Sequence, residues 1–429
     1  MADNTTLPGT GEVYAADDRG GVKFQRVLVE GEQDSASVDA FGRWRVSNPE
    51  TVFDSKLLGA DDGPLLWDES EESGSGGSFS TPTAAKPYID LASTNVTATT
   101  LTRQTFRRFN YQPGKSQLAM LTGVLELASG VTTGCERRFG LFDDDNGVFF
   151  ESSAGTVGVT IRSNDTGTPV DTTVAQVSWN LDVMDGGADA ENPSGLTVDW
   201  TKVQVFVMDY QWPTGRIRMG LEIDGHLWYV HEFSQANSDT TPWSSTPNLP
   251  LRVQLITTSS SGVNSMRAIS ATVMSEGGTR TSIPFSAGTT AHVDAAVADT
   301  VYALVGIRLK STHLGATVKV TEVSGMTELS DSYELQLIHN PTVASTFTYG
   351  NLTNSACQFA TGATANTVTG GTVIARGYGS LSVATIKLAG SDLLLGAAID
   401  ATVDELVLCV RPLNADADIQ GCINWEESP

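Results

Sequence analysis

The 429-residue sequence shows almost none of the amphipathic periodicity that indicates helices. Short runs rich in valine, isoleucine, threonine and aromatic residues are instead broken by glycine, asparagine, aspartate, serine and proline about every ten residues. This spacing is typical of sandwiches and jelly rolls rather than of parallel βαβ folds. The 42 glycines fit tight turns between such strands. The sequence therefore predicts an all-β fold.

Basic residues are scarce. Lysine and arginine number 26 against 50 aspartates and glutamates, which gives a formal net charge of -24. Binding to nucleic acid requires cations that neutralise phosphates, and binding to an anionic membrane surface requires the same sign of charge. We therefore expect no nucleic-acid partner and no membrane docking. The charge favours solubility and resistance to non-specific association.

Long apolar runs are also missing. No stretch approaches the roughly 20 residues that a bilayer span requires. Residues 1–4 lack the basic and apolar regions of a signal peptide. We therefore expect no membrane insertion, and synthesis in a cytoplasm.

Cysteine is rare, and the four that occur are far apart: Cys135, Cys357, Cys409 and Cys422. No CxxC spacing is present, which excludes a zinc ribbon and a thioredoxin-like redox motif. Two interpretations remain. The thiols are either buried and free, acting as small hydrophobic side chains, or Cys409 and Cys422 form a disulfide that spacing alone does not settle.

Catalytic motifs are absent as well. The sequence has no phosphate-binding GxxxxGK[ST] or GxGxxG at a strand-to-helix junction, no GxSxG and no HExxH. Residues 143–147 (DDDNG) fit either a calcium loop or a hairpin turn, and we favour the turn because the distal glutamate of an EF-hand is missing. A second glycine-rich acidic loop has the same two interpretations, with Asp182, Asp185, Asp189 and Glu191. We predict no metal, no cofactor and no catalytic residue.

Glycoside hydrolysis needs two carboxyl groups facing each other in a cleft. With 50 acidic residues, the number of acids carries no information on this point. Four tryptophans could stack on sugar rings, although such side chains more often fill a core or an interface: Trp200, Trp212, Trp228 and Trp243. We expect a protein without enzymatic activity.

The chain divides into four expected regions. Residues 1–56 are too poor in apolar runs to form a core and are expected to be an extended arm. Residues 57–86 contain the acidic run DESEE and the segment SGSGGS, which indicate a linker. Residues 87–276 and 277–429 each carry a dense series of strand candidates. We expect two antiparallel β-sandwiches of jelly-roll or lectin-like type after the arm and the linker.

Three segments resemble sequences that recur in bacteriophage virion proteins. They are residues 12–27 (EVYAADDRGGVKFQRV), residues 39–56 (DAFGRWRVSNPETVFDSK), which is the more specific match, and residues 106–117 (FRRFNYQPGKSQ). Together they cover 46 of the 429 residues, about a ninth of the chain. The resemblance implies a structural protein of the phage head surface, tail or fibre, and it brings no catalytic residues with it.

The second of these segments has the pattern of a docking strand. In an extended strand, Arg43 and Arg45 lie on one face, and Trp44 and Val46 lie on the other. Such a strand can add to the edge of a neighbour's sheet, with its arginines meeting acidic groups of the partner. The alternative is a first strand tucked into its own domain. The residues predicted to dock are Phe41, Arg43, Trp44, Arg45, Val46 and Phe53.

We therefore expect a structural component of a phage virion, made in the host cytoplasm, that docks through its N-terminal arm on other virion proteins. The arm would leave the β-sandwiches exposed on the particle or tail. By analogy with phage fibres and spikes, we expect a homotrimer. The alternative is a carbohydrate-binding module that recognises a glycan on the host surface.

Overall fold

The structure is a computed structural model. It describes residues 48–58, 63, 65–94, 98–127, 133–187, 191–213, 215–258, 263–278, 281–328, 331–380, 383–388, 395–414 and 416–428. In the first 47 residues it describes only the backbone of six short strands. The chain divides into two units, residues 1–48 and residues 49–429.

The first unit contains three antiparallel pairs of short strands. The pairs are β1 (Thr5–Thr6) with β2 (Val13–Tyr14), β3 (Ala16–Arg19) with β4 (Val22–Gln25), and β5 (Glu30–Gly31) with β6 (Asp34–Ser35). The hairpin of β3 and β4 falls within the first virion-like segment.

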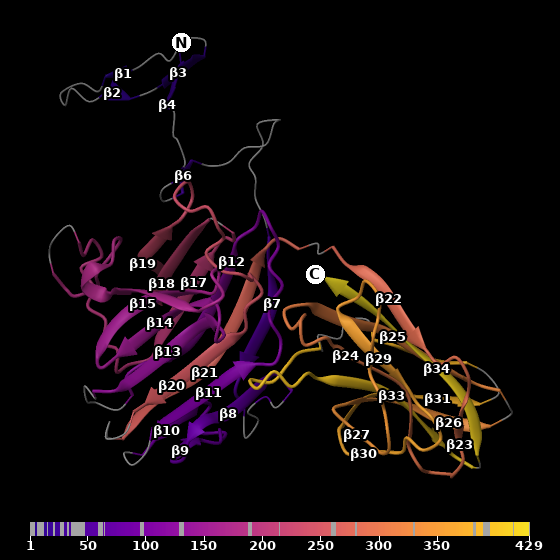
Figure 1. Cartoon of the computed structure of the whole chain (residues 1–429). Helices are drawn as coiled ribbons and strands as arrows, with labels where there is room; N and C mark the ends of the chain where they lie inside the picture. The colour runs from indigo at the N-terminus through magenta and orange to yellow at the C-terminus, as the bar shows by residue number, and fades with distance from the viewer. Residues whose placement is uncertain are drawn as a thin grey trace. The chain divides into compact units, whose positions relative to one another are not determined.

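The second unit begins with a sandwich whose first layer is an eight-stranded antiparallel sheet. In spatial order its strands are β19 (His226–Ser234), β18 (Arg216–Ile223), β17 (Gln204–Tyr210), β12 (Gln117–Val124), β21 (Asn264–Glu276), β10 (Ile89–Ser93) and β9 (Gly77–Phe79), with β7 (Pro49–Lys56) paired to β21. Figure 1 shows this layer with β7 beside β21.

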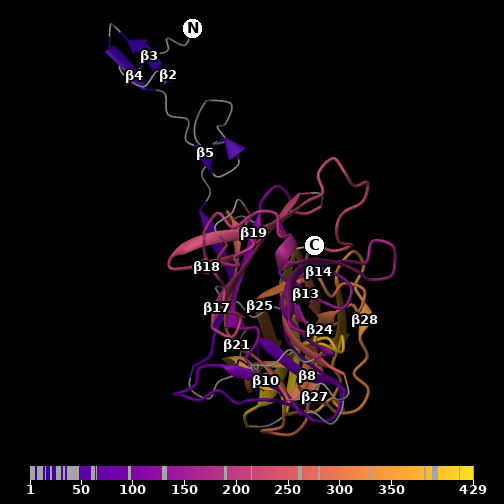
Figure 2. The ribbon, with the colours of Figure 1, turned by 90° about the vertical axis from the view of Figure 1, so that its left-hand side faces the viewer.

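The second layer is a seven-stranded antiparallel sheet. Its order is β16 (Val170–Ala175), β15 (Thr156–Ser163), β14 (Gly147–Ser153), β13 (Cys135–Phe142), β20 (Leu251–Thr257), β11 (Thr99–Thr105) and β8 (Trp67–Gly74). A single 3-10 turn, η1 (Gln176–Ser178), follows β16. Figure 2 shows the layers apart, with β17 and β21 in one and β13 and β14 in the other.

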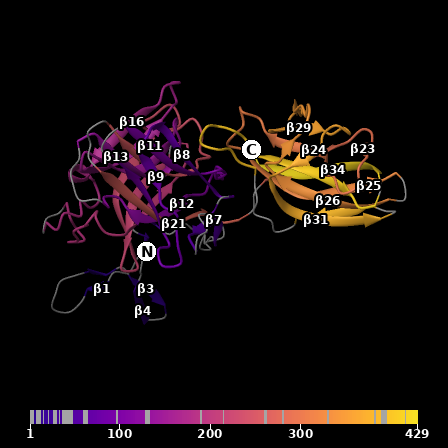
Figure 3. The ribbon, with the colours of Figure 1, turned by 90° about the horizontal axis from the view of Figure 1, so that it is seen from below.

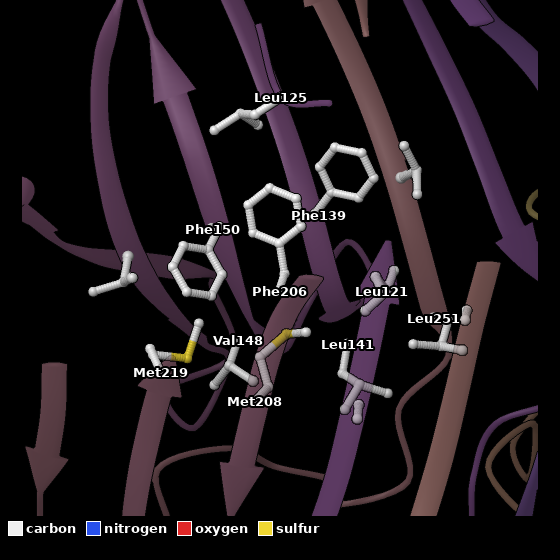
Figure 4. Packing of buried hydrophobic residues seen from close by; sticks show 14 of the residues in the cluster. Leu121, Leu125, Phe139, Leu141, Val148, Phe150, Phe206, Met208, Met219 and Leu251 are labelled. Atoms are coloured by element: carbon white, nitrogen blue, oxygen red, sulfur yellow. The ribbon is translucent and has the colours of Figure 1, made fainter. Parts of the chain in front are cut away.

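The core of this sandwich forms because alternate side chains of each strand point between the sheets. In β18, Ile217, Met219 and Leu221 are fully buried, and they alternate with more polar positions. Figure 4 shows Phe206 of β17 meeting Phe139 and Phe150 of the opposite sheet. The ring centroids of Phe139 and Phe206 lie 4.9 Å apart in a stacked arrangement.

Two expected boundaries need correction. Residues 49–56, assigned to the arm, form β7 of the eight-stranded sheet. The acidic run assigned to a linker forms most of β8, and the end of the SGSGGS segment contributes to β9. Trp67 anchors β8 in the core at 8% exposure, while Arg103 of β11 forms an ion pair with Glu69. Two acids of this edge strand therefore have partners, an arginine for Glu69 and the Thr99 hydroxyl and Gly77 N–H for Glu71.

The second sandwich lies between residues 283 and 428 and has sheets of five and six antiparallel strands. The five-stranded sheet contains β22 (Ile283–Gly288), β34 (Ala417–Ser428), β25 (Thr317–Thr327) and β32 (Ala384–Lys387), with β23 (Val293–Ala295) paired to β34. The six-stranded sheet has the order β28 (Gly350–Asn351), β29 (Cys357–Thr361), β24 (Tyr302–Leu309), β33 (Glu405–Pro412), β26 (Ser332–His339) and β31 (Thr372–Ser380). Figure 3 shows these strands in orange and yellow.

A short pair, β27 (Thr342–Val343) and β30 (Val368–Thr369), completes the second sandwich. The expected all-β class with two antiparallel sandwiches is confirmed. All four cysteines are free thiols, and three are buried, so Cys409 and Cys422 form no disulfide. Within the described residues, no helix has the length and hydropathy needed to cross a bilayer.

Candidate functional site

Of the six residues predicted to dock on a partner, five lie outside the described residues: Phe41, Arg43, Trp44, Arg45 and Val46. Phe53 is described and lies on β7 at 3% exposure. Its ring centroid is 5.1 Å from that of Phe109 and 6.0 Å from that of Trp67. The structure corrects the assignment of Phe53, which belongs to the core of its own sandwich. Docking by the other five stays a prediction.

The outward face of the seven-stranded sheet is polar, because it carries the side chains that alternate with the core positions. We call it the polar face, formed by Thr102, Gln104, Arg138, Phe142, Phe149, Glu151, Thr160, Arg162, Asp171, Thr173, Arg252 and Gln254. Several of these side chains are almost fully buried. Arg252 and Gln104 are each 1% exposed.

Hydrogen bonds connect the polar face across neighbouring strands. Arg138 donates to the Oε1 of Gln254 at 3.3 Å, and Gln254 donates to the hydroxyl of Thr102 at 3.0 Å. On the other side, the Nε of Arg138 lies 3.6 Å from Glu151, which accepts a 2.9 Å hydrogen bond from Thr173. The register thus places groups of complementary charge and hydrogen-bonding capacity side by side on neighbouring strands.

Aromatic rings fill the spaces between these cations. Arg138 and Arg162 both lie over the ring of Phe149, at 5.2 and 5.4 Å from its centroid. Gly140 is the cross-strand partner of Phe149, and a Cβ at position 140 would lie 2.5 Å from the Cβ of Phe149. The glycine is therefore required for the close approach of this ring to the sheet.

The acids of the polar face are paired with arginines. Asp171 accepts bonds of 2.8 and 2.9 Å from Arg162, and Asp144, at the edge of the face, accepts one of 2.5 Å from Arg252. Burial alone would raise the pKa of Asp171, but the hydrogen bonds and charge of Arg162 hold it below its ordinary value. These carboxylates are the partners of arginines in a network, an arrangement that favours a structural role for them.

The acidic segment at residues 143–147 forms the turn between β13 and β14. Asp143 accepts the backbone N–H groups of Asp145 and Asn146 through Oδ1, at 3.0 and 2.9 Å, and Arg108 lies 3.3 Å from its Oδ2. Backbone amides and an arginine therefore occupy the oxygens that a cation would need. The turn interpretation accounts for this segment.

The second acidic loop behaves similarly where it is described. Asp182 accepts the N–H groups of Met184 and Ser194, each at 3.0 Å. Asp185 accepts the N–H of Gly187 at 2.9 Å, and Asp189 lies outside the described residues. Among the described residues, no group of three or more histidine, cysteine, aspartate or glutamate side chains converges as a metal site would.

The four tryptophans considered for sugar stacking contribute mainly to the core of the first sandwich. Trp200 and Trp243 are buried core residues, at 9% and 3% exposure. Trp212 and Trp228 are half-buried and pack against the same core. The indole N–H of Trp212 donates to the carbonyl of Ser244 at 3.0 Å. This placement favours the packing interpretation for all four.

A pocket of about 470 Å³ lies at one end of the second sandwich, and we call it the end pocket. Its lining residues come from β22, from the end of β34 and from the segments that follow β24 and precede β29. They are Ile283, Phe285, Lys310, His313, Ala316, Asn354, Ser355, Ala356 and Glu427. Figure 1 shows that β34 ends beside the start of β22, where Ile283 and Glu427 are cross-strand partners.

The end pocket contains a buried carboxylate. Glu427 is 6% exposed and accepts hydrogen bonds from the Ser355 hydroxyl at 2.5 Å, the Ala356 N–H at 2.7 Å and the Trp425 indole at 2.8 Å. The ammonium group of Lys310 donates to the carbonyls of Leu352 and Ser355, at 2.9 and 2.5 Å. Neutral groups therefore hold both charges, in contrast to the polar face.

This site was not predicted from the sequence, although the residue pattern of β34 contains an indication of it. Alternate residues of the strand face the core, from Ala417 through Ile419, Ile423 and Trp425. Glu427 is the next position in that register and is the one acid among them. An acid at a core-facing position needs buried partners, and it is therefore a sequence-level indication of a site.

Comparisons with known proteins give no family. No family model and no curated protein matches the chain. Among solved structures, similar folds occur in an endo-1,3-β-glucanase from Streptomyces sioyaensis (11% identity, 56% of this chain, all of that chain, TM-score 0.36). They also occur in the CBM2 module of the evolved Dit of Lactobacillus casei BL23 phage J-1 (8% identity, 55% of this chain, all of that chain, TM-score 0.34). The Emp47p carbohydrate recognition domain is a third example (12% identity, 56% of this chain, all of that chain, TM-score 0.35). At these TM-scores the likeness carries no argument about function.

Proposed function

We propose that this protein is a non-enzymatic structural component of a bacteriophage particle. Residues 1–48 dock on another virion protein and leave the two sandwiches exposed, and the assembled form is a homotrimer made in the host cytoplasm. The observation that carries the proposal is the division of the chain after Asn48. In the second virion-like segment, residues 39–56, the stretch with alternating arginines and apolar residues is residues 43–46, which lies before that boundary.

The core of the first sandwich supports a docking role for residues 1–48 that is separate from the folding of the sandwiches. Among the described residues, the core begins at Phe53, and both of its sheets are built from residues 49–276. Within the described residues, the sandwich therefore has a hydrophobic core of its own. A segment with few long apolar runs gains order by packing on another chain.

The pairing of charges supports a structural rather than a catalytic role. On the polar face, Glu151, Asp171 and Asp144 lie next to Arg138, Arg162 and Arg252. A general acid or base needs access to a substrate and a pKa near the working pH. Carboxylates whose oxygens are taken up by arginine partners are arranged for such a structural role.

Truncation tests the docking role. Chains 1–429 and 49–429 would each be supplied with an affinity tag during infection, and purified particles would be probed for the tag. We expect the truncated chain to be folded and soluble yet missing from particles, because its sandwiches remain while the docking segment is gone. Incorporation of both chains at equal levels would contradict the proposal.

A second truncation provides the control. Chain 57–429 also lacks β7, which pairs with β21 and contributes Phe53 to the core. We expect it to be destabilised or insoluble, unlike chain 49–429. Equal behaviour of the two truncated chains would place the boundary of the arm elsewhere.

A further inference from the structure

The end pocket combines an aromatic floor with polar groups at its edge. Phe285 of β22 is half-buried, and its ring stacks on Trp425, with centroids 6.2 Å apart and planes 21° apart. Trp425 is 1% exposed and fixes the position of that ring from below. Ile283, two residues earlier on the same strand, is 50% exposed and extends the apolar surface. One face of the pocket thus offers a rigid apolar platform.

Hydrogen-bonding groups of both kinds lie around this platform. Lys310 uses two of its three ammonium hydrogens on backbone carbonyls, which leaves one donor. Glu427 already has four partners, the Ser355 hydroxyl, the Ala356 N–H, the Trp425 indole and the Cys357 thiol, so the acceptor for a ligand comes from the Asn354 amide oxygen. His313 and Asn354 are exposed at the rim. Donor and acceptor capacity are therefore held in place beside an aromatic ring.

The charges of the pocket give no net attraction to an ion. Lys310 and Glu427 are of opposite sign and offset each other, and the net charge of -24 on the chain disfavours anions. A neutral ligand with an apolar face and several hydroxyl groups fits best. A pyranose ring has this chemistry, since its C–H groups lie on its faces and its hydroxyls lie at its edge.

We propose that the end pocket binds one neutral pyranose ring of a saccharide, stacked on Phe285 with its hydroxyls bonded by Lys310, Asn354 and His313. The pocket volume of about 470 Å³ lies within the range of small-molecule sites. The site is built entirely from the second sandwich, so it does not depend on docking by residues 1–48.

The indole N–H of Trp425 provides a site-specific readout, because it is bonded to Glu427 and the ring stacks on Phe285. The 15N-labelled full chain would be titrated with methyl glycosides of glucose, galactose, mannose and N-acetylglucosamine. The Trp425 signal would be assigned from a Trp425→Phe variant. We expect at least one glycoside to shift this signal with a Kd on the order of 1 mM, as befits one small ring.

Variants connect the shift to the pocket. Phe285→Ala removes the platform, and we expect binding to weaken by about tenfold or more, equivalent to 1.4 kcal/mol. His313→Ala alters the exposed rim without touching the core, and it serves as a second pocket variant in case Phe285→Ala fails to fold. We expect it to weaken binding by about threefold. His292→Ala is the matched control, since His292 lies near Glu328 and Asp418 in the same sandwich and outside the pocket lining.

The outcomes separate the possibilities. If no glycoside moved the Trp425 signal at about 100 mM, far above the expected Kd, the proposal would be wrong. It would also be wrong if the Kd were unchanged in folded Phe285→Ala and His313→Ala, or if charged N-acetylneuraminic acid bound more tightly than the neutral rings. Weaker binding in these variants with normal particle incorporation would show the pocket and the arm to be independent. Failure of the truncation experiment would leave the pocket result unaffected.

Discussion

Residues 1–48 and residues 49–79 look alike in sequence, yet they have different places in the molecule. Both are polar and poor in apolar runs. The second stretch nevertheless contributes β7 and β9 to one sheet and β8 to the other, while the first forms a separate unit. The difference lies in a few anchors, Phe53 and Trp67, which reach the core from strands whose other residues are mostly polar. Average polarity therefore does not decide whether a segment joins a sandwich.

We expect Phe53→Ala to lower the free energy of unfolding more than any of the other substitutions. A small effect would contradict the comparison of the two stretches most clearly. The variant loses a buried ring that packs against Trp67 and Phe109. We expect the free energy of unfolding in urea to fall by about 4 kcal/mol. Trp44→Ala, in the first stretch, should leave that free energy unchanged and reduce incorporation into particles. Equal destabilisation by both variants would show that residues 1–48 belong to the same folded unit.

Arg138→Met should have the next largest effect, because it removes a cation from the polar face while keeping much of its apolar volume. Glu151 is 7% exposed and would lose its arginine partner. We expect a loss of about 3 kcal/mol in the free energy of unfolding, as for other buried ion pairs with one partner removed. Lys202→Met is the control, since Lys202 and Asp199 form an exposed pair at 4.0 Å, and no measurable change is expected. A neutral outcome for Arg138→Met would mean that the polar face adds little to stability.

We expect the pH dependence of the free energy of unfolding to arise from residues of the first sandwich rather than from the first 48 residues. Burial of His231 in β19 lowers its pKa to about 4, and its Nδ1 accepts the N–H of Asn180 at 3.2 Å. In the unfolded chain, His231 has a pKa of about 6.5. The unfolded state therefore binds more protons than the folded state between about pH 6.5 and about pH 4, and the folded state loses stability as the pH falls through this range. His231→Gln should flatten this decline in urea titrations. Chain 49–429 should keep it, and its loss on truncation would contradict the assignment.

Glu71→Gln should give the smallest effect and tests whether β8 is held as described. The hydroxyl of Thr99 and the N–H of Gly77 bond to Glu71 and hold the pKa of its carboxyl below the ordinary value. The stabilisation is present above about pH 4.5 and is lost as the pH falls through the lower pKa of the folded state. We expect a slight loss of stability at pH 7 that vanishes in strong acid, measured by urea unfolding at both pH values. A loss of equal size at both would assign the effect to packing rather than to charge.

The strand content and the two sandwiches could be predicted because alternation and turn residues are local signals. The alternation of apolar and polar residues over residues 217–223, for example, predicts a half-buried strand without any information on the strands that pair with it. The incorporation of β8 could not be predicted, since it depends on Arg103 lying beside Glu69 across a distance of 34 residues in sequence. The lining of the end pocket could not be predicted for the same reason. Glu427 is an unusual acid in its strand, but Lys310 and Ser355 come to lie beside it only in the folded sandwich.

The most direct test of the proposed function is a density map of the intact particle that traces residues 39–53. The account predicts that Phe41, Trp44 and Val46 pack on a neighbouring subunit, with Arg43 and Arg45 beside its acidic groups. In the same map, Phe53 should lie in its own sandwich next to Trp67. Density that placed Phe41 and Trp44 within their own subunit, away from every neighbour, would contradict the account.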